Sequence, residues 1–154
     1  MKTHRFIKQS EIDAPPEAVF AFHERPGIVE KLTPPWERIE MLEAAPDLKP
    51  GTRTVFKVFL GPIPRLWVAE HTEYIPDRLF ADVQREGPFA YWYHRHIFEP
   101  TGRGTTLMRD DVEYALPLSR VSDLIAGRFV RAKLQRMFDY RHRVLAERMK
   151  GQDR

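Results

Sequence analysis

From residue 36 to residue 115, short runs of mixed apolar and polar residues alternate with turns rich in proline or glycine. Each run has the length and the residue types of a β-strand. The turns are too short to cross over to a parallel neighbour, so consecutive strands are expected to pair antiparallel. The predicted strands cover residues 36–44, 52–60, 66–74, 79–85, 91–98 and 105–115.

The two ends of the chain show different patterns. Residues 3–12 alternate loosely and predict a first strand. Asp13 and the two prolines that follow it predict the start of a short helix, since proline fits the first helical turn, and a second short helix is predicted over residues 27–32. Apolar residues at helical spacing over residues 119–150 predict one long amphipathic helix, roughly 45 Å in length.

This order of elements predicts an α+β protein in which a seven-stranded antiparallel sheet wraps around the C-terminal helix, with two short helices after the first strand. The 154 residues, 42% of them apolar, are expected to form a single domain over residues 1–154. A strongly twisted sheet cannot close tightly on one straight helix. We therefore expect a ligand cavity between the sheet and the helix.

Several sequence segments carry a resemblance to a known family. They read IDAPPEAVF at residues 12–20, LTPPW at 32–36, WVAEH at 67–71, GPFAYWYHRH at 87–96 and DVEYALP at 111–117. With the predicted element order, they resemble the START-like superfamily of helix-grip proteins. This superfamily includes Bet v 1-type allergens, polyketide cyclase/dehydrase-like proteins and coenzyme Q-binding proteins, and the resemblance is strongest to bacterial single-domain members.

The resemblance spans essentially the whole chain and implies the helix-grip fold. It also implies a hydrophobic ligand, because members bind lipids, polyketides, plant hormones or quinones. Only some members are enzymes, so the fold does not by itself settle the function.

Composition excludes several classes of function. The chain has no cysteine, which excludes disulfide frameworks, thiolate nucleophiles, iron–sulfur clusters and zinc ribbons. None of its three serines lies in a G-x-S-x-G motif, and the G-x-G at residues 102–104 has no later glycine of a dinucleotide site. No apolar run approaches the roughly 20 residues that span a bilayer, and the first residues show no secretory leader. We expect a cytoplasmic protein without stable membrane insertion.

The charge pattern favours no nucleic-acid partner. The net charge is only +3, with 25 basic against 22 acidic residues, and both signs are interspersed along the chain. The arginines of the C-terminal helix are therefore interpreted as its solvated face.

Polar residues on the predicted strands are the candidates for chemistry. Side chains alternate along a strand, so His94 and His96 share a face with Trp92, and His71 shares a face with Trp67. If the tryptophans face inward, three imidazoles border the cavity. The candidate polar residues are His71, Gln84, His94, His96 and Asp111.

These residues admit three interpretations. Two histidines about 7 Å apart on one strand face can chelate a metal. Alternatively, an imidazole whose tautomer is set by Asp111 or Glu113 can act as a general acid or base. The interpretation we favour is hydrogen bonding within a partly polar pocket, with no catalytic residue, metal or cofactor. The enzymatic alternative assigns catalysis to His71, His94, His96 and Asp111.

Together these features predict a binding protein, monomeric or homodimeric, for a small hydrophobic ligand such as a lipid, polyketide, quinone or aromatic compound. The alternative is a cyclase/dehydrase-type enzyme that uses the pocket histidines, and a protein-interaction domain ranks below both. On the long helix, Phe129 is expected to pack at an edge of the sheet or against a short helix, because it lies opposite Phe138. The predicted ligand-binding residues are Phe56, Trp67, His71, Gln84, Trp92, His94, His96, Tyr114, Leu134, Met137 and Phe138.

Overall fold

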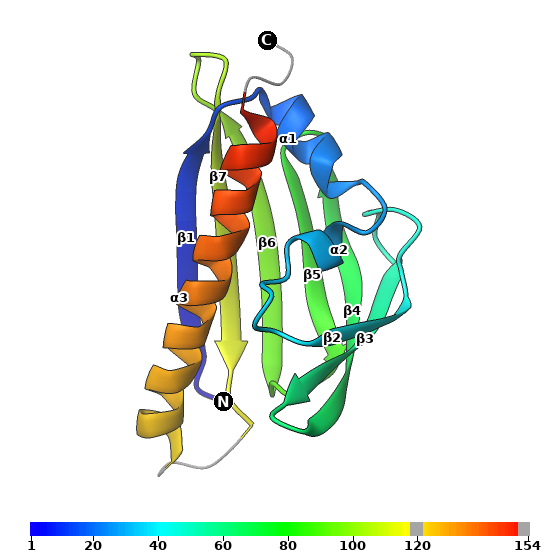
Figure 1. Cartoon of the computed structure of the whole chain (residues 1–154), viewed down its shortest axis with the longest axis vertical. Helices are drawn as coiled ribbons and strands as arrows, with labels where there is room; N and C mark the ends of the chain where they lie inside the picture. The colour runs from blue at the N-terminus through cyan, green and yellow to red at the C-terminus, as the bar shows by residue number, and fades with distance from the viewer. Residues whose placement is uncertain (118–121, 151–154) are drawn as a thin grey trace.

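The computed structural model describes residues 1–117 and 122–150, and these residues form the predicted α+β helix-grip fold (Figure 1). Seven antiparallel strands wrap around one long helix, and two short helices follow the first strand. The elements in chain order are β1 (His4–Ile12), α1 (Pro16–His23), α2 (Ile28–Lys31), β2 (Ile39–Glu43), β3 (Arg53–Leu60), β4 (Ile63–Ile75), β5 (Leu79–Glu86), β6 (Tyr91–Pro100), β7 (Thr106–Ala115) and α3 (Ser122–Met149).

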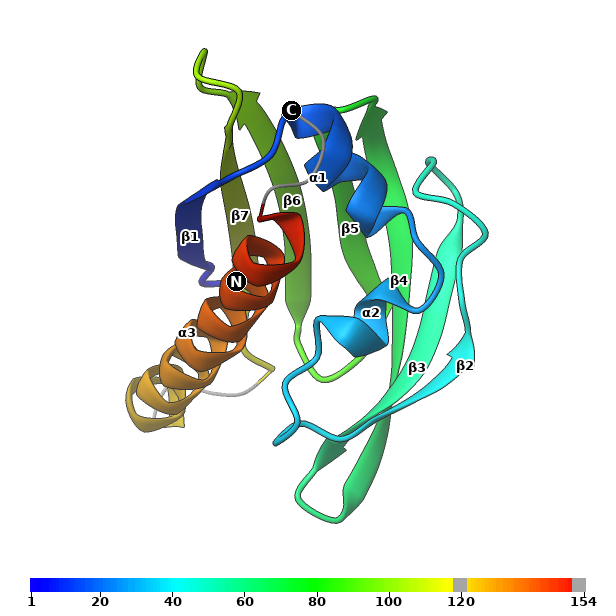
Figure 2. The same cartoon turned by 45° about the horizontal axis from the view of Figure 1, so that its top comes forward.

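The sheet has the strand order β1-β7-β6-β5-β4-β3-β2, and every neighbouring pair is antiparallel. The first strand therefore lies beside the last strand, and β2 to β7 form the predicted meander. Register shifts between β4 and β5 mark bulges, which increase the local twist of the sheet. The sheet curves around α3, while α1 lies over the upper part of β5 and β6 (Figure 2).

Some predicted boundaries are wrong. The segment 61–64 was expected to be a turn that ends one strand, but Ile63 and Pro64 already pair with β3. This is possible because Gly61 adopts a positive φ of 62°, which lets the chain reverse in a two-residue turn. The strand expected over residues 36–44 is shorter, at Ile39–Glu43. The expected start of the long helix at residues 119–121 lies outside the described residues.

The two halves of α3 differ in burial. Leu134, Phe138 and Leu145 are buried at helical spacing and face the sheet. None of the described residues from 125 to 133 is buried, and the side chain of Phe129 is 65% exposed. The expectation that Phe129 packs at a sheet edge or against a short helix is therefore wrong. Among the described helices, none combines the length and the apolar character needed to cross a membrane.

The core divides into two apolar clusters that flank the middle of the concave face. One cluster lies beneath α1 and the C-terminal end of α3, and the other lies between α3 and strands β1, β6 and β7. The largest buried members of the first are Phe20, Phe98, Ile12 and Met108, and those of the second are Tyr114, Phe6 and Phe138.

Candidate functional site

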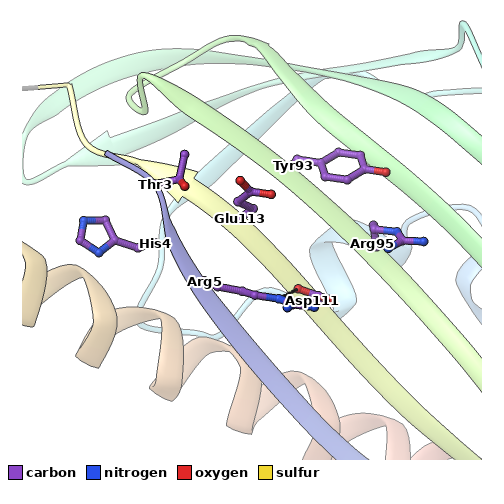
Figure 3. A pocket seen from close by; sticks show the side chains of 7 residues that line it. All are labelled: Thr3, His4, Arg5, Tyr93, Arg95, Asp111 and Glu113. Carbon is purple, nitrogen blue, oxygen red and sulfur yellow. Dashed lines mark hydrogen bonds and ion pairs between the residues drawn. The ribbon is translucent and has the colours of Figure 1, made fainter. Parts of the chain in front are cut away.

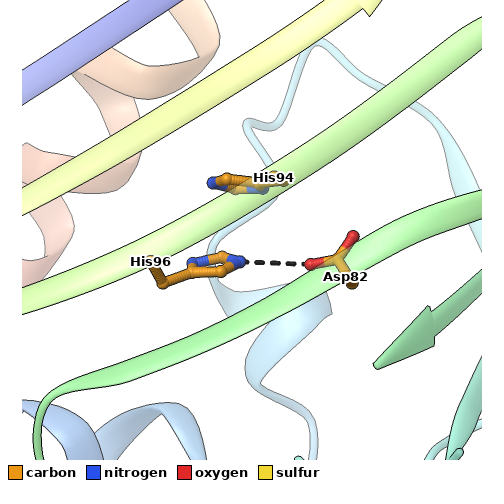
Figure 4. Close-up of side chains that lie close together, drawn as sticks. All are labelled: Asp82, His94 and His96. Carbon is orange, nitrogen blue, oxygen red and sulfur yellow. Dashed lines mark hydrogen bonds and ion pairs between the residues drawn. The ribbon is translucent and has the colours of Figure 1, made fainter. Parts of the chain in front are cut away.

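Between the two apolar clusters, polar side chains fill the centre of the concave face. His94 and His96 point inward from β6 because side chains alternate along a strand. Asp82 lies on the neighbouring strand β5, and Figure 4 shows His94, His96 and Asp82 close together. Asp110 on β7 pairs in register with His96, and α3 contributes His142. The structure therefore brings together a histidine–aspartate cluster, which we define as Asp82, His94, His96, Asp110 and His142.

Asp110 is the centre of the cluster's hydrogen bonding. Its Oδ1 atom lies 2.7 Å from His94 Nε2 and 3.2 Å from His96 Nδ1. Its Oδ2 atom lies 2.6 Å from His142 Nε2. The other nitrogen of His142 hydrogen-bonds to the hydroxyl of Ser10. A single buried carboxylate thus fixes one nitrogen on each of three imidazole rings.

The two β6 histidines stack face to face. Their ring centroids are 3.7 Å apart, and the other face of His96 stacks on Phe80 at 3.9 Å. The Nε2 atom of His96 lies 3.2 Å from Asp82 Oδ2 (Figure 4). His96 therefore bridges two carboxylates, whereas His94 contacts one.

This difference separates the pKa values of the stacked pair. Burial would lower the pKa of His96, but its hydrogen bonds to Asp110 and Asp82 outweigh burial and raise that pKa. Burial and the neighbouring charge of His96 instead lower the pKa of His94, despite its bond to Asp110. His96 is therefore the ring that holds a proton more readily, and His94 is the ring that remains neutral.

The carboxylates of the cluster stay ionised. Burial would raise the pKa of Asp110, but hydrogen bonds from His142, His94 and His96 hold it well below its ordinary value. Asp82 is also lowered in pKa, because the hydrogen bond from His96 and the histidine charges outweigh burial. Arg141 on α3 has a buried Nε atom that finds no hydrogen-bond partner among the described residues. Its guanidinium offers a free donor near the two negative charges.

Two of the predicted polar residues lie at the margin of this cluster. His71 on β4 is buried, but its Nδ1 atom lies 2.9 Å from the hydroxyl of Thr52. Burial lowers the pKa of His71. Gln84 holds the turn after β5, since its side-chain amide makes two hydrogen bonds to the backbone of Phe89 at 2.8 and 3.1 Å.

Asp111 does not join the histidines, which corrects the expected constellation. Its carboxylate accepts hydrogen bonds from Arg5 at 2.9 and 2.5 Å on the outer face of the sheet. The inward acid is its neighbour Asp110, which has the same strand parity as Tyr114. Because Tyr114 was already predicted to face the ligand, this parity was the signal that could have identified Asp110.

Other members of the site were missed by the sequence analysis. His142 follows Leu134 and Phe138 at intervals of four residues, so helical spacing could have placed it on the inward face. Asp82 and Ser10 had no such signal, because their contacts depend on strand register and on the docking of α3.

A row of aromatic rings leads to the histidine–aspartate cluster. Phe56 stacks on Trp67 with centroids 5.8 Å apart, and Trp67 meets Trp92 at 5.3 Å. Trp92 in turn lies 6.2 Å from the ring of His94. Phe56 and Trp67 are only partly buried, while Trp92 and His94 are buried. The row therefore runs from an accessible apolar edge to a buried polar end.

The remaining predicted ligand residues border this row. Tyr114 lies beside Trp92, with ring centroids 6.4 Å apart. Phe138 packs on His94 at 5.3 Å, and Leu134 and Met137 belong to the same apolar cluster. All three helix residues therefore lie on the side of α3 that faces the sheet.

Two surface pockets lie away from this row. One has a volume of about 350 Å³ on the outer face of the sheet, where Arg5 pairs with Asp111 (Figure 3). The other, of about 400 Å³, lies beside α2 and residues 33–39. Between the sheet and α3, the predicted ligand residues Trp92, Tyr114, Leu134 and Phe138 pack in one apolar cluster.

The donor set of the cluster also suits a cation. Asp82, His94 and His96 each offer one ligand atom, and the three atoms lie within 4.8 Å of one another. Imidazole nitrogen and carboxylate oxygen are common ligands of divalent transition metals. Chemically, the cluster can accept a hydrogen bond, exchange a proton or bind a metal ion.

Comparison with solved structures finds the same fold in several proteins. The chain is 29% identical to a nucleoside-diphosphate sugar epimerase from Corynebacterium glutamicum, with a TM-score of 0.74, and the match covers 94% of this chain but only 29% of that one. It is 15% identical to the Zhui aromatase/cyclase from Streptomyces sp. R1128, with a TM-score of 0.72. That match covers 97% of this chain and 94% of the aromatase/cyclase. A START superfamily protein from Mycobacterium smegmatis is 15% identical to the chain, with a TM-score of 0.71. The match covers 96% of this chain and 97% of that one.

Sequence comparison identifies the family. No curated protein matches the chain. Residues 12–139 match the family model described as polyketide cyclase / dehydrase and lipid transport. Since this match covers most of its length, the chain belongs to the polyketide cyclase/dehydrase and lipid transport family, and it shares the helix-grip fold of START-like proteins.

Proposed function

We propose that the protein binds a small hydrophobic molecule along the aromatic row, with a polar group of the ligand directed toward the histidine–aspartate cluster. The observation that carries this proposal is the continuity of the row from Phe56 and Trp67 to Trp92 and His94. Ligand sites commonly combine an apolar lining with a few convergent polar groups. The family description, which includes lipid transport, supports the same class of ligand.

Entry of the ligand requires side chains of the row to separate from α3. The first described part of α3 is suited to this movement, because residues 125–133 include no buried residue. Gly127 also lies in this part, where glycine weakens a helix by about 1 kcal/mol relative to alanine. The second half of α3, from Leu134 onward, is anchored by buried residues. Opening is therefore expected at the N-terminal half of α3.

Binding can be tested by titration with the fluorescent probe 1-anilinonaphthalene-8-sulfonate. We expect saturable binding with one site per chain. Trp67→Leu should raise the Kd at least tenfold, which corresponds to about 1.4 kcal/mol. Trp36→Leu is the matched control, because Trp36 is 52% exposed and lies outside the row. Absence of saturable binding, or an equal effect of both substitutions, would contradict the proposal.

A second candidate function is proton transfer on a bound carbonyl compound. The opposite pKa directions of His94 and His96 favour it, because acid and base sites are separated in this way. Neutral His94 would remove a proton from the carbon next to the carbonyl, and protonated His96 would donate its proton to the carbonyl oxygen, which yields the enol. The aromatase/cyclase with the same fold makes an aromatic or polyketide-like substrate a reasonable choice for this chemistry.

Exchange of hydrogen for deuterium in 2-tetralone, followed by NMR in D₂O, tests the second candidate. Acceleration by the parent protein should saturate with 2-tetralone and fall at least tenfold in His94→Phe. His4→Phe, which changes a histidine outside the cluster, should exchange 2-tetralone like the parent. If 2-tetralone binds but its exchange is no faster than in buffer, the protein is a binding protein without this activity.

A further inference from the structure

Asp82, His94 and His96 have their ligand atoms within 4.8 Å of one another, on two adjacent strands (Figure 4). Two imidazoles and one carboxylate form a donor set that divalent transition metals bind readily. The three residues belong to a rigid sheet, since both strands are paired on both sides. Their relative positions are therefore fixed by backbone hydrogen bonds rather than by a flexible loop.

The hydrogen bonds of Asp110 leave the correct ring nitrogens available. Asp110 lies 2.7 Å from His94 Nε2, so the free nitrogen of His94 is Nδ1. It also lies 3.2 Å from His96 Nδ1, so the nitrogen of His96 that remains is Nε2, on the side of Asp82. Histidines that bind metals generally donate their other N–H to a carboxylate or carbonyl in this manner. Asp110 thus orients both rings without itself being a ligand.

The separation of two of the donors fits a metal ion. His96 Nε2 and Asp82 Oδ2 are 3.2 Å apart. In a tetrahedral site with bonds of about 2.0–2.1 Å, two ligand atoms are separated by roughly 3.3 Å. An ion can therefore replace the proton between these two atoms with little movement of either side chain.

The electrostatic surroundings also favour a cation. Two carboxylates, Asp82 and Asp110, lie within hydrogen-bond distance of the two histidine rings. Access to the site is on the side of Asp82, whose side chain is 16% exposed, whereas those of His94 and Asp110 are 5% and 4% exposed.

We propose that Asp82 Oδ2, His94 Nδ1 and His96 Nε2 bind one divalent first-row transition ion, such as Zn²⁺, with Asp110 as a positioning residue. This inference stands on the geometry of the cluster and departs from the sequence-based expectation of no metal. Three protein ligands leave a fourth position open, as in catalytic rather than structural zinc sites. A carbonyl or hydroxyl oxygen of a ligand in the aromatic row is the group that this position would receive.

Titration with Co²⁺ tests the proposal, because its visible absorption reports both binding and geometry. After treatment with a chelator, the full chain should bind one equivalent of Co²⁺, with the absorption of a four- or five-coordinate ion, and Zn²⁺ should displace it. Asp82→Asn and His94→Leu should each weaken binding at least tenfold. Asp110→Asn should weaken it by about 10- to 100-fold, the usual effect of removing a residue that orients a metal-binding histidine.

His4→Phe is the matched control, since it removes a histidine outside the proposed ligand set, and it should bind Co²⁺ like the parent. Circular dichroism of each variant establishes that it is folded. If the parent binds no Co²⁺ at 100 μM, the proposal is wrong whatever the variants do, and the cluster holds protons alone. If Asp82→Asn and His94→Leu bind as tightly as His4→Phe, the ion binds elsewhere on the surface, and the proposal is also wrong.

Discussion

Asp110 and Asp111 are neighbours in β7, yet they lie on opposite faces of the sheet and have different partners. Asp111 pairs with Arg5 on the outer face, where the side chain of Arg5 is 63% exposed. Asp110 is buried on the inner face among three histidines. The same residue type therefore pairs with one exposed arginine at one position and forms the centre of a buried network at the next.

The difference matters because the two environments have different energetic consequences. An ion pair with an exposed partner such as Arg5 contributes about 0–1 kcal/mol, since water already solvates the guanidinium. A buried ion costs several kcal/mol in lost solvation, and well-packed apolar residues often stabilise a protein as much as a buried network does. Stability alone therefore does not account for the histidine–aspartate cluster. The proposed binding of a ligand at the cluster would account for it.

Asp110→Asn is expected to have the largest effect on stability. It removes the charge that three histidines share, so the free energy of unfolding should fall by about 3–5 kcal/mol. Urea denaturation followed by circular dichroism measures this change. A loss below 1 kcal/mol would mean that the inner network contributes no more to stability than the outer ion pair does.

Phe138→Ala extends the comparison to the two halves of α3. Phe138 is buried against Phe6 and His94, so its truncation should cost about 3–5 kcal/mol. Phe129→Ala, on the exposed half of the same helix, should change stability by less than about 0.5 kcal/mol. Thermal or urea unfolding of both variants provides the measurement. Similar losses in both would show that the N-terminal half of α3 is packed as firmly as the second half.

His23 gives the inner face a distinctive dependence on pH. Burial, with a smaller contribution from the charge of His96, lowers the pKa of His23 from 6.5 to about 4. Between these values the unfolded chain binds a proton that the folded protein does not, so stability is lost as the pH falls. The loss amounts to about 3 kcal/mol between pH 6.5 and pH 4. When the free energy of unfolding is plotted against pH, the parent and His23→Phe should diverge in this window and run parallel above pH 7.

Asp111→Asn should have the smallest effect. Its pKa is lowered chiefly by the hydrogen bond from Arg5, against a smaller opposing effect of burial. Because the arginine is mostly exposed, the loss of stability should stay below about 1 kcal/mol and should shrink as salt is added. A loss comparable to that of Asp110→Asn in urea denaturation would remove the contrast between the two faces.

The sequence predicted the fold well because local signals determine it. Proline and glycine turns separate the strands, and the short connections allow only antiparallel pairing. The same alternation predicted that His94 and His96 share a face with Trp92, and the structure shows that this face points inward. Along β7 the parity of Tyr114 places Asp110, rather than the predicted Asp111, on the inner face. The contact of Asp82 with His96 depends on strand register. The contact of Ser10 with His142 depends on the docking of α3.

The central claim, that the buried cluster is the polar end of a ligand site, can be tested directly with the imidazole nitrogens. Long-range ¹H–¹⁵N NMR spectra should be recorded while 2-naphthol, a hydrophobic probe with one hydroxyl, is added to the protein. Our account predicts that the ring signals of His94 and His96 shift together and saturate along with the probe. Saturation of the probe while both sets of signals remain unchanged would contradict it.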